Sequence, residues 1–244
     1  MNIALVGYGK MGKAIEEIAT GKGHTIVLKV NDENLSDLTI ENLKMADVAI
    51  EFTTPKSAVE NILLCFEAGV AVVCGTTGWL KQKEFIEKKC HEANGTFLTT
   101  SNFSVGVNIF FELNRKLAIL MKPHKEYDVQ IEEIHHTQKK DAPSGTAISL
   151  AEQVIENSSS KNKWASKSYE EKNADAKDKE LAIRSKRIDP AAGTHSIKYT
   201  SEIDDIEIIH TAHNRKGFAA GALLAAEFIH DKKGIFMMKD VLGI

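Results

Sequence analysis

The chain has 244 residues, enough for one large domain or two modest ones with sizeable cores. Hydrophobic residues make up 43% and charged residues 27%, as in soluble globular proteins, and the formal net charge of −3 argues against a general nucleic-acid binder. No stretch reaches the ~18 apolar residues of a membrane span, and the N-terminus has no basic region followed by a long apolar run. These features predict a two-domain cytoplasmic enzyme that binds neither nucleic acid nor membrane.

The three cysteines, Cys65, Cys74 and Cys90, have neither paired nor metal-type spacing. This predicts a reducing compartment and ordinary buried thiols. We expect no metal site, structural zinc included.

The first thirty residues predict a strand, a helix and a second strand. The apolar run at residues 3–6 is typical of a buried parallel strand, and a G-x-G-x-x-G motif follows it at once. In this setting Gly7 permits a tight turn, Gly9 lets the backbone approach a pyrophosphate, and Gly12 lets the helix pack close to the sheet. The alternative is a glycine-rich turn without a ligand. The cofactor-binding residues expected here are Gly7, Tyr8, Gly9, Lys10, Met11 and Gly12.

The end of the second strand, at residues 24–30, suggests how the cofactor is chosen. An acidic residue at this place accepts hydrogen bonds from the adenosine ribose, and we assign that role to Asp32, with Asn31 as the second candidate. Residues 34–37 contain no lysine or arginine, so a 2′-phosphate would meet little positive charge there. NADH is therefore favoured over NADPH, and use of both remains open.

Three more apolar strands are predicted at residues 47–52, 70–74 and 96–100, with helices between them. Short polar segments follow the last two strands, at the carboxyl edge where parallel sheets bind dinucleotides. Either segment could also be a packing turn. The residues that we add to the expected cofactor site are Gly75, Thr76, Thr77, Thr100, Ser101, Asn102 and Phe103.

Beyond residue 104 the strand–helix alternation ends, and a second domain is predicted. A helix at residues 105–121 precedes a strand at 127–134, and residues 158–180, rich in Ser, Lys, Glu, Asp and Asn, predict a solvated excursion. Strands at 181–184, 195–200 and 206–211 would complete a mixed or antiparallel sheet. An alanine-rich helix at 218–229 suits packing against the first domain.

The predicted fold class is therefore α/β: an N-terminal Rossmann-type doubly wound parallel sheet with a second α+β domain built on a mixed or antiparallel sheet. The expected boundaries are 1–104 for the dinucleotide-binding domain, 105–214 for the substrate-binding domain, and 215–244 for the C-terminal helix that returns to the first domain.

A polar cluster lies between the strand at 127–134 and a helix that begins near residue 147. The segment from His135 to Thr146 holds two adjacent histidines, two lysines and a Pro-Ser-Gly-Thr turn. Histidine can donate a proton near neutral pH, and a helix N-terminus presents backbone N–H groups to an anion. Any one of these residues alone would more often be a solvated surface residue, and the turn could be an ordinary helix cap. Together they predict a site for a small acidic substrate.

With these motifs assembled, the sequence closely resembles the 4-hydroxy-tetrahydrodipicolinate reductase family, also called dihydrodipicolinate reductases, of the diaminopimelate and lysine pathway. The resemblance covers nearly the whole chain. Residues 133–147 are its most specific part, and residues 7–12, 75–77 and 101–108 match in the same order. The resemblance implies an NAD(P)H-dependent oxidoreductase that reduces a conjugated double bond in a cyclic imine with two carboxylates, with loss of water.

The resemblance also implies roles for single residues. His135 would be a proton donor or acceptor and Lys139 the second proton donor. The substrate contacts would be His136, Ser144, Gly145 and Thr146. Family members are typically homotetramers built through the sheet of the second domain, so a homotetramer is expected, although the segment between His195 and His210 looks shorter than in many members.

Two rival assignments belong to other classes of protein. A semialdehyde dehydrogenase would need a cysteine nucleophile beside a base, and none of the three cysteines has a convincing setting. A nucleotide-sensing regulatory protein would explain the first domain but would leave the histidine–lysine cluster without a use.

Overall fold

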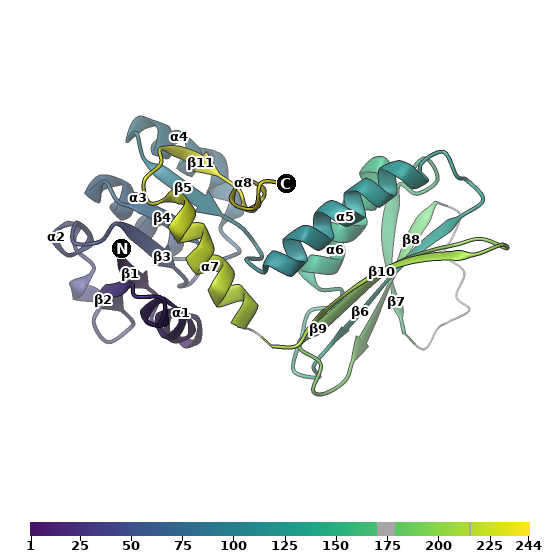
Figure 1. Cartoon of the computed structure of the whole chain (residues 1–244), viewed down its shortest axis with the longest axis horizontal. Helices are drawn as coiled ribbons and strands as arrows, with labels where there is room; N and C mark the ends of the chain where they lie inside the picture. The colour runs from purple at the N-terminus through teal and green to yellow at the C-terminus, as the bar shows by residue number, and fades with distance from the viewer. Residues whose placement is uncertain (170–178, 215) are drawn as a thin grey trace. The chain divides into compact units, whose positions relative to one another are not determined.

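A computed structural model describes residues 1–169, 179–214 and 216–244 of the chain (Figure 1). The chain divides into two compact units: unit 1 is Met1–Val105 with Lys216–Ile244, and unit 2 is Gly106–Arg215. Unit 1 is built on a six-stranded sheet, called sheet A, and unit 2 on a five-stranded sheet, called sheet B. Among the described residues, no helix has both the length and the apolarity needed to cross a membrane.

Sheet A is entirely parallel and has the order β11-β5-β4-β3-β1-β2. Because β1 pairs with β2 on one side and β3 on the other, the direction of winding reverses at β1, and ligands of such sheets bind at the carboxyl edge there. The strands are β1 (Asn2–Val6), β2 (Thr25–Val30), β3 (Val48–Glu51), β4 (Ala71–Cys74), β5 (Thr96–Thr99) and β11 (Gly234–Phe236). The helices of unit 1 are α1 (Lys10–Gly21), α2 (Ile40–Leu43), α3 (Ala58–Ala68), α4 (Lys83–Glu92), α7 (Lys216–Ile229) and α8 (Met238–Leu242), with short 3-10 turns η1 (Leu35–Asp37) and η2 (Leu80–Gln82).

The strands of sheet A are apolar on both sides because helices cover both faces. In β1, Ile3 and Leu5 join a core with α1, α7 and α8, whereas Ala4 and Val6 join a second core with α2, α3 and α4. This gives three layers, helix, sheet and helix. The predicted Rossmann-type parallel sheet is confirmed.

The helix α7 returns the C-terminal segment to unit 1 and packs on α1 and on strands β3 and β4. Gly221 lets this helix pack closely on the segment that follows β5. A Cβ atom at that position would lie 1.8 Å from the carbonyl oxygen of Phe103, far inside van der Waals contact.

Unit 2 consists of two helices on one face of sheet B, whose order is β10-β9-β6-β8-β7. Strand β6 is parallel to β8 and antiparallel to β9, so the sheet is mixed, as predicted. The strands are β6 (Asp128–His135), β7 (Lys163–Ser168), β8 (Glu180–Arg187), β9 (Gly193–Thr200) and β10 (Asp205–Ala212), and the helices are α5 (Val105–Met121) and α6 (Gly145–Asn157).

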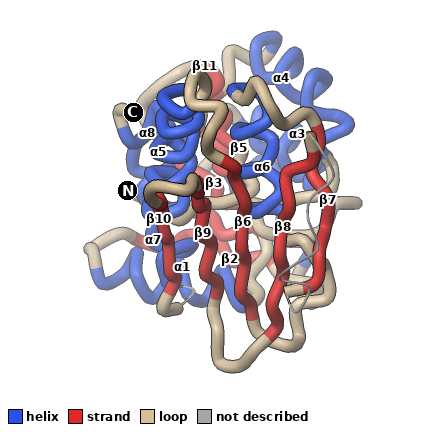
Figure 2. The backbone as a smooth tube through the Cα atoms, turned by 90° about the vertical axis from the view of Figure 1, so that its right-hand side faces the viewer, coloured by secondary structure: helices blue, strands red, loops and turns tan. Residues whose placement is uncertain are grey.

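Alternation along β6 directs its side chains to two different environments. Val129, Ile131, Glu133 and His135 are buried on the side of α5 and α6, where the core of unit 2 lies. Figure 2 shows the opposite face of sheet B, which no described helix covers. The site described below therefore begins where the helix-covered face of β6 changes from apolar to polar side chains.

The predicted solvated excursion at residues 158–180 is wrong for residues 163–168. These form β7, which pairs in parallel with β8 at the edge of sheet B. An edge strand has a neighbouring strand on one side only. A strand as polar as Lys163–Ser168 can form there because its backbone hydrogen bonds to β8 hold it in place. Residues 170–178 of the predicted excursion lie outside the described residues.

Candidate active site

The loop between β1 and α1 has the geometry of a phosphate cradle. Gly7 has a φ of +100°, and a Cβ atom there would lie 2.0 Å from the carbonyl oxygen of Phe52. A Cβ atom on Gly12 would lie 2.8 Å from the carbonyl oxygen of Gly7, whereas one on Gly9 would meet nothing within 4 Å. Gly7 and Gly12 therefore allow close packing of the backbone, and Gly9 leaves open space for a ligand. No side chain caps α1 at Gly9, so the N–H groups of its first turn can bind an anion.

Three cavities follow the carboxyl edge of sheet A on both sides of this loop. Their volumes are about 480, 370 and 190 Å³. The largest is lined in part by Gly7, Tyr8, Gly9, Asn31 and Asp32. The second is lined in part by Lys10, Met11, Gly75, Thr76 and Thr77, and the third by Thr76, Thr77, Thr100 and Ser101 among others. Unit 1 thus gathers most of the residues that the sequence assigned to the cofactor at one edge of its sheet.

Three of the expected cofactor residues are buried and shape the surrounding loops. Gly12 packs beneath the glycine loop. The side-chain oxygen of Asn102 accepts a hydrogen bond from the backbone N–H of Ser104 at 2.9 Å. Phe103 is only 2% exposed, and its ring lies 5.7 Å from that of Phe52, centroid to centroid.

The segment after β3 contributes lining residues that the sequence analysis did not select. Phe52 and Thr53 line the two larger cavities. Glu51, fully buried, ties this segment to the one after β4: its carboxylate accepts hydrogen bonds from the Thr53 N–H and the Thr76 hydroxyl, both at 3.0 Å. The feature of the sequence that could have pointed to this segment is Glu51, an acidic residue at the end of an otherwise apolar strand.

At the end of β2, Asn31 and Asp32 differ in what their side chains do. The Asn31 side-chain oxygen accepts a hydrogen bond from the Glu33 N–H at 2.8 Å and so closes the turn. Asp32 is exposed in the wall of the largest cavity. The nearby Lys29 is paired with Glu16 at 3.0 Å, so its charge is already partly neutralised.

In unit 2, His135 ends β6 beside a buried carboxylate. Its Nδ1 lies 2.9 Å from Oε2 of Glu133, in contact although not aligned as a regular hydrogen bond. Nδ1 is sealed from solvent, while 10% of the side chain stays exposed, and Nε2 is the remaining nitrogen. The ring edge at Nε2 lies against Gly193, where a Cβ atom would approach it to 3.1 Å. A proton donated by His135 would therefore leave from Nε2.

Glu133 is ionised near neutral pH. Burial alone raises the pKa of its carboxyl group, but polar interactions with the side chains around it, that of His135 first, outweigh burial and hold this pKa well below its ordinary range. Its other oxygen, Oε1, accepts a hydrogen bond from Nη2 of Arg187 at 2.8 Å.

His195, on the neighbouring strand β9, completes a buried cluster that the sequence analysis did not find. Its ring lies 5.1 Å from that of His135, and its Nε2 lies 3.1 Å from the hydroxyl of Ser144. Burial, reinforced by the nearby positive charges, lowers the pKa of His195 to about 3, so this imidazole is neutral at neutral pH. Ser144 also caps α6 by accepting a hydrogen bond from the Ala147 N–H at 3.2 Å.

Lys139 lies in the loop between β6 and α6, and its positive charge is partly accessible. Its Nζ contacts both carboxylate oxygens of Asp141, at 2.8 and 2.9 Å, and its side chain is 23% exposed. The Asp141 side chain is 60% exposed. An ion pair so open to solvent is worth at most about 1 kcal/mol, so an anionic ligand can compete for Lys139.

Glu133, His135 and His195 also place three possible metal-ligand atoms within 4.8 Å of one another. Oε1 of the carboxylate is paired with Arg187, and Nε2 of His195 contacts the Ser144 hydroxyl, whereas Glu133 Oε2, His135 Nδ1 and His195 Nδ1 have no regular hydrogen-bond partner among the described residues. A cation at these atoms would lie close to the Arg187 guanidinium, whose positive charge opposes its binding. We therefore interpret the cluster as a hydrogen-bond and ion-pair network.

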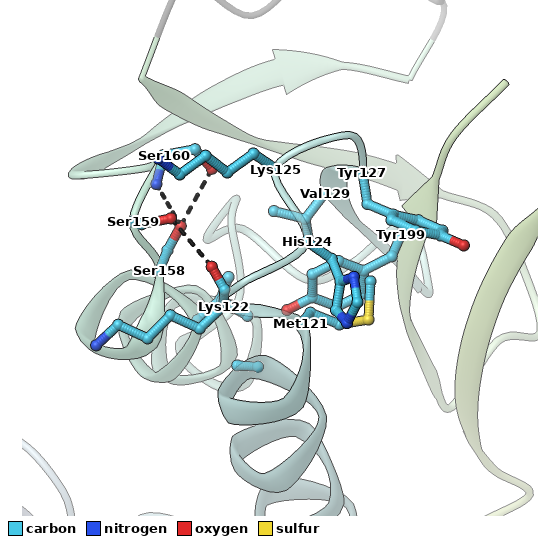
Figure 3. A pocket seen from close by; sticks show the side chains of 12 residues that line it. Met121, Lys122, His124, Lys125, Tyr127, Val129, Ser158, Ser159, Ser160 and Tyr199 are labelled. Carbon is cyan, nitrogen blue, oxygen red and sulfur yellow. Dashed lines mark hydrogen bonds between the residues drawn. The ribbon is translucent and has the colours of Figure 1, made fainter.

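A separate hollow in unit 2 lies where α5 ends, between Met121, His124 and Tyr199 (Figure 3). Its volume is about 20 Å³, which is room for a water molecule and not for a substrate.

The thiols support neither a nucleophile nor a redox centre. Cys65, Cys74 and Cys90 are unpaired and buried, as predicted. Burial raises the pKa of the Cys65 thiol to about 12 and that of Cys90 to about 11, and it raises the pKa of Cys74 as well. Thiols held in the protonated form do not provide the nucleophile that a semialdehyde dehydrogenase would need.

A doubly wound sheet with an open glycine cradle is the architecture of a dinucleotide-binding domain, which is the class of protein that unit 1 defines. Family models give the particular class: those described as the N-terminus and the C-terminus of dihydrodipicolinate reductase match residues 1–103 and 106–242. The chain belongs to the dihydrodipicolinate reductase family.

Individual relatives agree with this assignment. The chain is 49% identical to the 4-hydroxy-tetrahydrodipicolinate reductase of Christiangramia forsetii, in an alignment covering 100% of this chain and 98% of that one. It is 37% identical to the enzyme of the same name from Methanococcoides burtonii, over 96% of this chain and 86% of that one. A solved structure of dipicolinate-bound dihydrodipicolinate reductase from Paenisporosarcina sp. TG-14 has a TM-score of 0.76, with 24% identity over 97% of each chain, which supports the fold.

Proposed function

We propose that the chain catalyses the NAD(P)H-dependent reduction of 4-hydroxy-tetrahydrodipicolinate to tetrahydrodipicolinate, with loss of water, in cytoplasmic diaminopimelate and lysine biosynthesis. The observation that carries this proposal is the arrangement of His135 and Lys139 before the N-terminus of α6, in a chain whose relatives bear that enzyme's name. A substrate with two carboxylates requires cations and N–H donors, and this segment offers both.

In this proposal the two parts of the chain divide the work. Residues 1–104 bind the dinucleotide, with residues 215–244 packed against them, and residues 105–214 bind the substrate. The dinucleotide supplies a hydride when bound. Hydride transfer builds up electron density on the substrate, which a nearby acid must neutralise.

The residues of unit 2 would supply that acid and hold the substrate. His135 exchanges a proton through Nε2, and Lys139 acts as a second donor and as a positive charge for a carboxylate. Gly145 is exposed in the first turn of α6 with open space beside its Cα, as a close approach by an anion requires. The remaining substrate contacts in this proposal are His136, Ser144 and Thr146.

The direct test is turnover with freshly generated 4-hydroxy-tetrahydrodipicolinate. We expect the absorbance of NADH to fall in the presence of both substrate and protein, and to stay constant when either is left out. Absence of turnover with NADH and with NADPH would overturn the proposed function.

We further propose that NADH is the preferred cofactor. Two acidic residues, Asp32 and Glu33, line the largest cavity, and we assign the ribose contact to Asp32; the positive charge nearest to it in sequence, Lys29, is paired with Glu16. A 2′-phosphate beside Asp32 would add like-charge repulsion. NADH should therefore give the higher kcat/KM.

The variant Asp32→Ala should weaken NADH binding by about tenfold, or ~1.4 kcal/mol, and NADPH binding by much less. Dissociation constants from cofactor fluorescence would measure both. Glu41→Ala removes an exposed negative charge elsewhere in unit 1 and should change neither constant. Equal losses for NADH and NADPH in Asp32→Ala would argue against a ribose contact at this residue.

We also propose a homotetramer built through sheet B. The face of sheet B in Figure 2 and the adjoining β9–β10 turn expose apolar side chains, with Ile209 at 59% and Ile203 at 89% exposure. Burial of such residues against further copies of the chain would remove this apolar surface from water.

A further inference from the structure

One buried ion pair in unit 2 has no role in the proposed function. Glu133 is fully buried on the helix-covered face of β6, and Arg187 ends β8 with 19% of its side chain exposed. We propose that these two are positioning residues for proton transfer: Glu133 sets the orientation of His135, and Arg187 fixes the loop that carries Lys139. The proposal rests on the roles proposed above for His135 and Lys139.

The first half of the proposal concerns the two nitrogens of His135. Oε2 of Glu133 lies 2.9 Å from Nδ1. A flip of the imidazole ring would place a carbon atom against this ionised carboxylate, which is buried away from solvent. Nδ1 has no other partner among the described residues. The carboxylate therefore favours the orientation, and in the neutral ring the tautomer, that carries a proton on Nδ1 and directs Nε2 outward.

The second half concerns the loop of residues 136–144. The guanidinium of Arg187 that binds Glu133 also donates hydrogen bonds to two carbonyl oxygens of this loop, from Nη2 to Asp141 at 2.6 Å and from Nε to Lys139 at 3.4 Å. Asp189, two residues further along, accepts hydrogen bonds from the N–H and hydroxyl of Thr137. The backbone of Lys139 is thus fixed from β8, while its side chain stays accessible.

Stability alone does not account for this pair. The two preceding positions on the same face of β6, Val129 and Ile131, are apolar core residues. Taking two charges out of water is expensive, and apolar replacements of similar volume are often as stable or more so. A charged pair at this place is better explained by the groups it orients, since each partner contacts a proposed proton donor or its loop.

The variant Glu133→Gln keeps the size of the side chain and removes its charge. We expect kcat to fall roughly 10- to 100-fold, with the substrate KM within a few-fold, because His135 loses its orientation and no group that contacts the substrate is removed. The same split is expected for direct loss of His135, and a general loosening of the fold would not produce it.

Nitrogen NMR gives a readout that does not depend on activity. Of the nine histidines in the chain, His135 can be assigned by the signals missing from His135→Ala. In the wild type at high pH, we expect a proton on Nδ1 and none on Nε2. In Glu133→Gln the population should shift toward the Nε2-protonated tautomer, because the carboxylate that selected Nδ1 is gone.

The variant Arg187→Lys keeps one positive charge for Glu133 but cannot also bridge two carbonyl groups of the loop. We expect the His135 tautomer to stay as in the wild type, while kcat falls and substrate KM rises, each by several-fold. Arg115→Lys is the matched control, because Arg115 bonds Glu112 on the exposed face of α5 and touches none of these groups. It should behave as the wild type.

The outcomes separate this proposal from the proposed function. If the wild type turns over and His135→Ala loses kcat, but Glu133→Gln retains both kcat and the Nδ1 tautomer, the positioning role of Glu133 is wrong. If Arg187→Lys matches the control Arg115→Lys in kcat and KM, the role of Arg187 is wrong. If the wild type itself shows no turnover, the proposed function fails, and the tautomer of His135 still reports whether Glu133 orients it.

Discussion

Replacing His135 with alanine should lower kcat by roughly 10²–10⁴, the usual range for loss of a general acid, while substrate KM stays within a few-fold. The reason is that, in the proposed role, the ring can reach the substrate only through Nε2, because Nδ1 is sealed against Glu133. The loss therefore removes a proton pathway and little binding energy. Steady-state kinetics with NADH and the dicarboxylate substrate measure both constants.

Two comparisons make this result specific to His135. NADH binding, followed by fluorescence, should survive the change because the glycine loop belongs to unit 1. His124→Ala removes an exposed histidine of unit 2 that pairs with Glu126 and contacts the ring of Tyr127, and it should retain wild-type kcat. Near-complete retention of kcat in His135→Ala would show that the proton comes from His136 or from a bound water.

Loss of Lys139 should look different. Its ammonium group can attract a carboxylate as well as give a proton, so Lys139→Ala should depress kcat and raise substrate KM together. The exposed pair with Asp141 offers little resistance to that attraction. A loss of kcat alone in one variant and a change in both kcat and KM in the other would assign the two proposed proton donors to different tasks.

Most of unit 1 could be predicted from the sequence because its information is local. Buried parallel strands are continuous apolar runs, and the glycine motif marks the first strand–helix turn, so β1, β3, β4 and β5 are placed within a residue or two. The short elements α2, β11 and α8 were not predicted. Each is too short to show a period, and β11 forms only because β5 offers an edge to pair with.

The edge strand β7 was missed because its sequence is polar. Its composition, with Lys, Ser and one Trp, is that of a solvated segment, and nothing local distinguishes it from a loop. It becomes a strand because β8 presents unpaired backbone groups beside it. The amino-acid composition of a segment reflects how far its side chains are buried. An edge strand with few buried side chains is therefore hard to recognise from its composition.

In the site too, residues that are close together in the sequence could be predicted, whereas residues that come from distant parts of the chain could not. The segment from His135 to Thr146 was found because its members are adjacent in sequence. Its partners Arg187 and His195 were missed because they reach it through sheet register, which pairs His135 with Arg187 and Glu133 with His195. The alternation of apolar and polar residues could indicate that the Glu133 side chain lies on the buried face of its strand, but it could not indicate which groups neutralise the charge.

Between pH 7 and pH 5, the largest expected effect of pH on stability comes from His195. Its pKa falls from 6.5 to about 3 on folding, chiefly because burial disfavours the charged ring. The folded protein therefore binds fewer protons than the unfolded chain between these values, so its stability is full above pH 6.5 and is lost as the pH falls toward 3. At pH 5 this single group should cost about 2 kcal/mol relative to pH 7.

The variant His195→Gln tests this assignment, because glutamine is neutral at every pH and its amide can still reach the Ser144 hydroxyl. Of the two tryptophans, Trp164 belongs to unit 2 and Trp79 to unit 1, so urea unfolding in a Trp79→Phe background follows unit 2 by fluorescence. The wild type should lose about 2 kcal/mol more than His195→Gln between pH 7 and pH 5. Tyr199→Phe, a core change in the same strand whose tyrosine has a pKa raised to about 12, should shift stability equally at both pH values. If His195→Gln lost as much stability on acidification as the wild type, the proton responsible would have to be bound elsewhere in unit 2, and the neutral, buried state of His195 would be wrong.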